Sequence, residues 1–315
     1  MGVLKAMMLV MGVIFVGLVL LSLMSTPDGP GTEAPSQQYD TGGFQPDQYQ
    51  NEQYQVPPID TNPPELPMPE TYGQASGWLV NNSIYNSEIA VPVMCEATPI
   101  NLRGASVGEL REHFNLMTGC LMRVFAPAVE SAGYVAVRPS VTIYDTPVQT
   151  RCGTMPRQNA AYCAADQQVY YSTELPDIVP GQLRGVNYVV ESVIAHEFAH
   201  AIQGRTGILI SNAAWEQNSN ESDANEFSRR LEVQADCWSG QFINSVGQSV
   251  GVDANGVEQL AMLFHSIGDD QLTGDPFIDG NHGLGENRRA WFLEGTATTS
   301  MGACNTFAAP DNQVR

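Results

Sequence analysis

Residues 196–200 have the sequence HEFAH, in which two histidines stand four positions apart and a glutamate follows the first. On a helix this HExxH spacing places both imidazoles on one face, with the carboxylate beside them. Imidazole nitrogens at this spacing bind Zn²⁺, and a neighbouring carboxylate can take a proton from a zinc-activated water. We therefore predict His196 and His200 as metal ligands and Glu197 as the general base. The alternative is a structural helix whose histidines only satisfy hydrogen bonds in the core.

A catalytic zinc site usually has a third protein ligand and one position open to water. Glu232 and Asp236 are four residues apart on the next expected helix, so their side chains share a face. We predict that Glu232 completes a site for one zinc per chain. Asp236 is then expected to accept the outer N–H of a ligand histidine. His265 and the pair Asp269 and Asp270 are alternative third ligands.

The elements that must hold these residues are mostly helices. Apolar periodicity predicts helices near residues 186–203, 222–246, 256–267 and 286–293. An earlier helix follows the capping-box pattern at residues 106–109. Two strands are expected at 137–144 and 168–172, separated by a loop that contains Cys152 and Cys163. Few strands followed by many helices indicate the α+β class, mostly helical with a small sheet.

The N-terminal region has a different composition. Residues 6–24 carry no charge and are about long enough to cross a hydrocarbon core, so we expect 1–24 to be a transmembrane anchor. A cleavable signal peptide is the alternative, although no small-x-small site follows. Lys5 precedes this segment, which predicts a single-pass cell-membrane protein with a cytoplasmic N-terminus and an extracytoplasmic domain. Residues 25–76, rich in Pro, Gln and Tyr, are expected to be a disordered linker before a domain at 77–315.

Charge and cysteine content narrow the partners and the compartment. The chain has 34 acidic and 14 basic residues, and its formal charge of -20 repels phosphate backbones, which argues against nucleic acid as a partner. Six cysteines, an even number, all follow the expected anchor, as disulfides in an oxidising compartment would. Six buried thiols in a cytosolic protein are the alternative. The sequence does not predict an oligomeric state.

The ordered set of motifs resembles the bacterial putative neutral zinc metallopeptidases over roughly residues 82–308. The matching blocks are YCAAD at 162–166 with VYY at 169–171, AHEFAHAIQ at 195–203, LEVQADC at 231–237, HG at 282–283 with Arg288, WF at 291–292 and CNTF at 304–307. Ala199 and Ala201 depart from residues common in the family, but neither is a proposed ligand. The resemblance implies a zincin-like metallopeptidase domain of the gluzincin type, HExxH…ExxxD.

This resemblance implies hydrolysis of peptide bonds in a protein or peptide substrate. Zinc would lower the pKa of a water toward about 7, and Glu197 would take its proton and pass it to the leaving amine. The strand near 169–172 could present an edge on which an extended peptide aligns, and the alternative is an internal strand. The sequence thus predicts a membrane-anchored extracytoplasmic zinc endopeptidase. A non-catalytic zinc-stabilised envelope binding module and a metal-dependent amidase of cell-wall peptides are the alternatives.

His282 and Arg288 stand six residues apart near the last expected helix. Integral-membrane HExxH…ExxxD peptidases carry a similar late His-Pro and Arg, although Gly283 replaces the proline here. We expect His282 to stabilise the oxyanion of the reaction, and Arg288 to brace its loop or pair with an acidic residue near the zinc. The alternative is that His282 caps the helix and Arg288 is a surface charge.

Three disulfides are expected. Cys152–Cys163 encloses only ten residues, a loop that closes easily. The resemblance and the order of the cysteines imply the other two pairs, Cys95–Cys120 and Cys237–Cys304.

Overall fold

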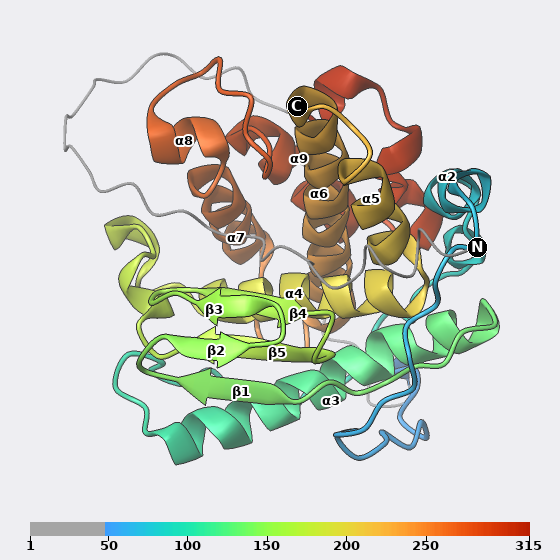
Figure 1. The fold of residues 1–315 in the computed structure, drawn as a ribbon. Coiled ribbons are helices and arrows are strands. Elements are labelled where there is room, and N and C mark those ends of the chain that lie inside the picture. Colours follow the sequence, from blue (N-terminus) through green and yellow to red (C-terminus); the bar gives the residue numbers. More distant parts are fainter. Residues whose placement is uncertain (1–47) are drawn as a thin grey trace.

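Two long helices form the frame on which the other elements pack. The computed structural model describes residues 48–315. In it, α4 (Val189–Arg205) packs against α6 (Glu221–Val246), and α9 (Gly285–Thr296) packs along α6 and against α7 (Ala254–Ser266). Figure 1 shows α4 between a small sheet on one side and the bundle of α6, α7 and α9 on the other. The expected class, α+β with mostly helices, is confirmed.

The strands form two small sheets. In the larger one, β5 (Gln168–Ser172) lies between β1 (Val141–Tyr144), to which it is parallel, and β4 (Ala160–Cys163), to which it is antiparallel. β2 (Val148–Thr150) and β3 (Gly153–Met155) form an antiparallel pair. Of the two possibilities for residues 169–172, an edge strand or an internal one, the structure shows the internal strand, because β5 has a neighbour on each side. The edge strand beside α4 is β4.

Local sequence signals explain where the main helices begin. At α3 (Val107–Ser131), Ser106 and Glu109 form the expected capping box. The side chain of Asn220 caps α6, and that of Asp253 caps α7. Buried aromatic residues then join the helices, since Phe264 of α7 stacks on Phe292 of α9 with ring centroids 4.6 Å apart. Three helices were not anticipated: α2 (Tyr72–Val80), α5 (Ile208–Glu216) and α8 (Asp269–Thr273).

The region before residue 77 differs from the expected linker. Pro57 O accepts a hydrogen bond of 3.2 Å from Arg138 Nη1, and Pro64 O accepts one of 2.9 Å from Arg205 Nη2. α2 begins at residue 72, where the Thr71 side chain caps it. Residues 48–76 are thus part of the folded unit, and the expected boundary at 77 is too late for them.

Residues 1–47, which hold the expected anchor and the first part of the expected linker, lie outside the described residues. From residue 48 onward, no helix combines the length and the apolar character that a membrane span requires.

Three disulfides connect distant parts of the domain, and all three expected pairings are confirmed. Cys95–Cys120 joins the segment before α3 to that helix. Cys152–Cys163 joins the β2–β3 turn to the end of β4. Cys237–Cys304 joins α6 to the C-terminal segment. The bond at β4 reaches the functional site described below, since Cys152 lines the same cavity.

Candidate metal centre and active-site cleft

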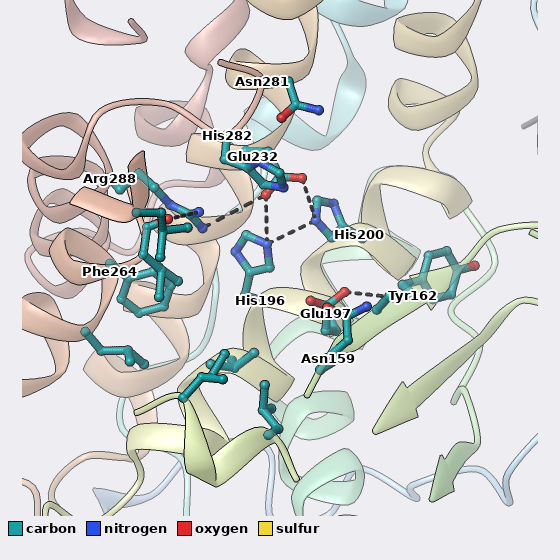
Figure 2. A pocket seen from close by; sticks show the side chains of 18 of the residues that line it. Asn159, Tyr162, His196, Glu197, His200, Glu232, Phe264, Asn281, His282 and Arg288 are labelled. Atoms are coloured by element: carbon teal, nitrogen blue, oxygen red, sulfur yellow. Dashed lines mark hydrogen bonds and ion pairs between the residues drawn. The ribbon is translucent and has the colours of Figure 1, made fainter. Parts of the chain in front are cut away.

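Helices α4 and α6 bring three buried side chains to one point. His196 Nε2 lies 3.3 Å from Glu232 Oε2, and His200 Nε2 lies 3.3 Å from Glu232 Oε1. The two Nε2 atoms are 3.1 Å apart. Within residues 48–315, this is the one group of three or more His, Cys, Asp or Glu residues that could hold a metal ion, and one ligand atom from each lies within 4.8 Å of the others. Figure 2 shows the three side chains converging.

The partners of the two imidazole rings show that the group fits a cation. His196 Nδ1 lies 2.8 Å from Asp236 Oδ1, and His200 Nδ1 lies 2.7 Å from Gln203 Oε1. When each ring holds its proton on Nδ1, facing these oxygens, the lone pair of Nε2 points toward Glu232, whose Oε1 lacks a hydrogen-bond partner. Two lone pairs and a carboxylate repel one another unless a cation lies among them. Two imidazoles and one carboxylate are a donor set of catalytic zinc sites.

Gln203 is a functional residue that sequence reasoning missed. Its Nε2 donates to Leu231 O at 2.8 Å and to Gln234 Oε1 at 3.0 Å. These two bonds fix the orientation of the amide, so that its oxygen faces His200. The signal in the sequence was a glutamine three residues after His200, which places it on the same side of α4.

Asp236 and Arg288 form a buried pair behind His196. Arg288 Nε and Nη2 each lie 2.9 Å from a carboxylate oxygen of Asp236, and Nη2 is 4.0 Å from Glu232 Oε2. Burial alone would lower the pKa of Arg288, but the carboxylates of Asp236 and Glu232 raise it. The guanidinium is therefore charged, and α9 holds the carboxylate that orients His196. Arg288 is 4% exposed, so the surface-charge alternative is wrong.

Glu197 lies beside the three candidate ligands and is held by the edge strand. Its Oε2 accepts a hydrogen bond of 2.7 Å from Tyr162 N of β4. Burial raises the pKa of Glu197, an effect that His196 and His200 oppose. One carboxylate oxygen is thus fixed by the strand, while the other is left for the cleft (Figure 2).

His282 lies on the loop before α9 and is held by Asp269. Asp269 Oδ2 accepts hydrogen bonds from His282 N at 2.8 Å and Gly283 N at 2.9 Å, while its Oδ1 is 3.3 Å from His282 Nδ1. Burial works against the charged form of Asp269, but these bonds lower its pKa. His282 Nε2 is buried without a hydrogen-bond partner, and the residue lines the same cavity as His196 and Glu197.

The alternative third ligands are not part of the metal group. His265 Nε2 pairs with Glu286 Oε1 at 3.3 Å. Asp269 holds the His282 loop, and Asp270 Oδ1 accepts a hydrogen bond of 2.7 Å from Gly285 N. All three therefore have other partners.

The site lies in a cavity of about 340 Å³. Its polar wall includes the three ligand residues, Glu197, His282 and Arg288. Asn159, which sequence reasoning also missed, lines it just before β4, and its Nδ2 is buried without a hydrogen-bond partner. An unpartnered amide beside Glu197 is available to a ligand that enters the cavity (Figure 2).

Comparison with known proteins agrees with this geometry. The sequence model of the family described as "Putative neutral zinc metallopeptidase" matches residues 106–307. "Uncharacterized protein YpfJ" of Escherichia coli (strain K12) is 29% identical over 188 residues, which cover 56% of this chain and 64% of the relative. "Uncharacterized protein Mb2605" of Mycobacterium bovis is 27% identical over 193 residues, 55% of this chain and 64% of the relative. The similarity thus spans less than two thirds of each relative. No solved structure matches the chain.

Proposed function

Because the chain belongs to the family described as "Putative neutral zinc metallopeptidase", we propose that it is a zinc-dependent endopeptidase. The observation that carries this proposal is one cavity in which the ligand atoms of His196, His200 and Glu232 converge beside Glu197. A structural zinc site usually has four protein ligands and has no use for a free carboxylate next to it. This difference favours hydrolysis over a binding module that holds zinc only for stability.

When bound, Zn²⁺ supplies the Lewis acidity that acidifies a water and polarises a carbonyl. Glu197 is the group placed to move the proton. The Tyr162 amide fixes its Oε2, so the carboxylate keeps one orientation while the other oxygen accepts a proton from water and later delivers it to the leaving amine. Asp236 and Gln203 face Nδ1 of the two histidines, an arrangement that favours a proton on each Nδ1 and leaves both Nε2 atoms free to bind the metal.

His282 is placed to donate a hydrogen bond to the carbonyl oxygen as negative charge develops on it. Asp269 Oδ1 lies 3.3 Å from Nδ1, so Nε2, which has no hydrogen-bond partner, is the ring nitrogen left to face a substrate. The three contacts to Asp269 fix both the ring and its loop before substrate arrives. This contact would be stronger in the transition state than with the ground-state substrate.

The edge of β4 is the place where an extended substrate can align. Asn159 O accepts a hydrogen bond from Ser172 N of β5, so main-chain groups at Asn159, Ala161 and Cys163 point toward β5. Those of Ala160 and Tyr162 then point the other way, and Tyr162 N already donates to Glu197. A peptide that pairs with Ala160 would therefore run past the general base.

Metal dependence of turnover tests this function. The purified full chain, incubated with a mixture of unstructured peptides, should cleave them only when zinc is bound, with products identified by mass spectrometry. Chelation should abolish cleavage and added zinc should restore it. Zinc-dependent hydrolysis of amide bonds in cell-wall peptides, without cleavage of the unstructured peptides, would instead favour the amidase alternative. Stoichiometric zinc without any cleavage would favour the binding module.

A further inference from the structure

The cleft has two chemically different halves along α4. Val190, Val193, Glu197 and His200 follow one another at intervals of three or four residues, so they share one face of the helix. Glu197 and His200 form the reactive half. The two valines form the other half, and both line the same cavity of about 340 Å³. Val193 is one turn before Glu197 and is therefore its neighbour on the helix surface.

Two further elements enclose the valine half. The segment after β5 and helix α7 each contribute three apolar lining residues: Leu175, Ile178, Val179, and Leu263, Phe264, Ile267. In Figure 2, side chains made only of carbon gather below His196 and next to Phe264, on the side away from Asn281 and His282. Val193, Ile178 and Ile267 are only partly buried, so part of each side chain remains open to the cavity.

This half of the cleft cannot stabilise a charged group. None of its eight lining side chains carries a charge or a hydrogen-bonding atom. A charged or strongly polar side chain placed there would lose its water without gaining a partner, whereas an apolar one gains from leaving water. The cavity volume lies within the range of sites that enclose small ligands.

We infer that the valine half is a specificity subsite for a bulky apolar side chain, such as Leu, Ile, Met or Phe, on a residue that flanks the scissile bond. Of the two α4 valines, Val193 is nearer to Glu197 along the helix. The size of its side chain therefore limits the space of the subsite next to the general base. This inference rests on the proposed peptidase function and assigns its substrate class.

Hydroxamates allow the subsite to be tested without turnover. Acetohydroxamic acid reports on the metal alone, and the hydroxamates of N-acetylglycine, N-acetylleucine and N-acetylaspartate add a side chain to the same group. Calorimetry on the zinc-loaded full chain should give at least about tenfold tighter binding of the leucine than of the glycine compound, and no gain for the aspartate compound. Equal affinities for leucine and glycine would overturn the subsite while the metal site stands. Failure of acetohydroxamic acid to bind would overturn the proposed function together with the subsite.

Substitutions at Val193 test whether the preference for the leucine hydroxamate arises in the valine half of the cleft. Val193→Phe fills the subsite, so the preference for leucine over glycine should disappear, while zinc content and affinity for acetohydroxamic acid stay as in the wild type. Val135→Phe is the matched control, since Val135 is 61% exposed and does not line the cavity. It should leave all affinities unchanged.

Val193→Ala tests the opposite change and does not depend on whether the phenylalanine variant folds. A wider subsite should shift the preference from the leucine compound toward the N-acetylphenylalanine hydroxamate by several-fold. Leucine selectivity that stays at the wild-type level in Val193→Ala would overturn the assignment.

Discussion

Glu232 lies on a different helix from the two histidines, so the third ligand depends on tertiary contact and is the residue to test first. His196→Ala, His200→Ala and Glu232→Ala should each reduce bound zinc far below one per chain, because each removes one of three ligands. Metal analysis of the purified variants measures this. His265→Ala is the matched control and should keep its zinc, since His265 pairs with Glu286. Full occupancy in Glu232→Ala would remove Glu232 from the site.

His282 offers a second residue-scale prediction. If its Nε2 donates to the developing oxyanion, His282→Ala should retain zinc, leave KM little changed and lower kcat by roughly 100-fold, the usual scale for one lost oxyanion donor. Steady-state kinetics with metal analysis on the same sample measures both properties. Full activity would make His282 dispensable, and loss of zinc would make it a ligand.

Some residues of the site can be predicted from their spacing in the sequence, whereas the roles of others depend on partners that only the folded structure shows. HExxH and ExxxD have helical spacing, so the sequence predicted that His196 and His200, and likewise Glu232 and Asp236, share a face. Asp269 is an alternative metal ligand on sequence grounds, because the sequence does not show which partners the fold gives to a carboxylate. In the structure its Oδ2 accepts hydrogen bonds from two amides of the His282 loop, and its Oδ1 lies 3.3 Å from His282 Nδ1.

At the scale of elements, the close crossing of α6 and α9 holds the metal ligand, Asp236 and Arg288 together. A Cβ at Gly240 would lie 2.0 Å from Phe292 O, and one at Gly295 would lie 1.9 Å from Cys237 O. Both contacts are with backbone, which cannot move aside without separating the helices. Gly240→Ala and Gly295→Ala should therefore each lower the free energy of unfolding by about 1–3 kcal/mol or more. Urea denaturation with the disulfides intact measures this.

Gly77→Ala is the control for these two variants. Gly77 is also helical, within α2, but a Cβ there meets nothing within 4 Å. This substitution should leave stability unchanged or raise it by up to about 1 kcal/mol, because alanine favours the helix. Equal stability of all three variants would contradict the close packing of α6 on α9.

The elements were predicted well where their periodicity was long and poorly where they were short. The four helices after residue 186 and the helix after Ser106 were predicted from apolar spacing and caps. β2, β3 and β4 have three or four residues each. Such short strands show no clear alternation of apolar and polar residues, so the sequence predicts a loop there. Residues 48–71 were read as linker because they dock partly through main-chain carbonyls, such as Pro57 O and Pro64 O, which composition does not reveal.

For the whole molecule, we propose that residues 1–24 anchor the chain in a membrane with the domain on the extracytoplasmic side. The three disulfides agree with an oxidising compartment, since they persist there. The full chain should sediment with membranes, withstand washing with high salt and dissolve only in detergent, whereas a chain lacking residues 1–24 should be released. Immunoblots of the fractions measure this. Recovery of the full chain in the soluble fraction would contradict the anchor.

We propose that the molecule uses Glu197 to hydrolyse peptides at a zinc centre. Glu197→Gln tests it most directly, because the amide keeps the shape of the side chain but cannot accept a proton from water. Zinc content and peptide hydrolysis should be measured on the same preparations of wild type and variant. The account predicts about one zinc per chain in both, and loss of nearly all hydrolysis in the variant. Undiminished hydrolysis by zinc-loaded Glu197→Gln would contradict it.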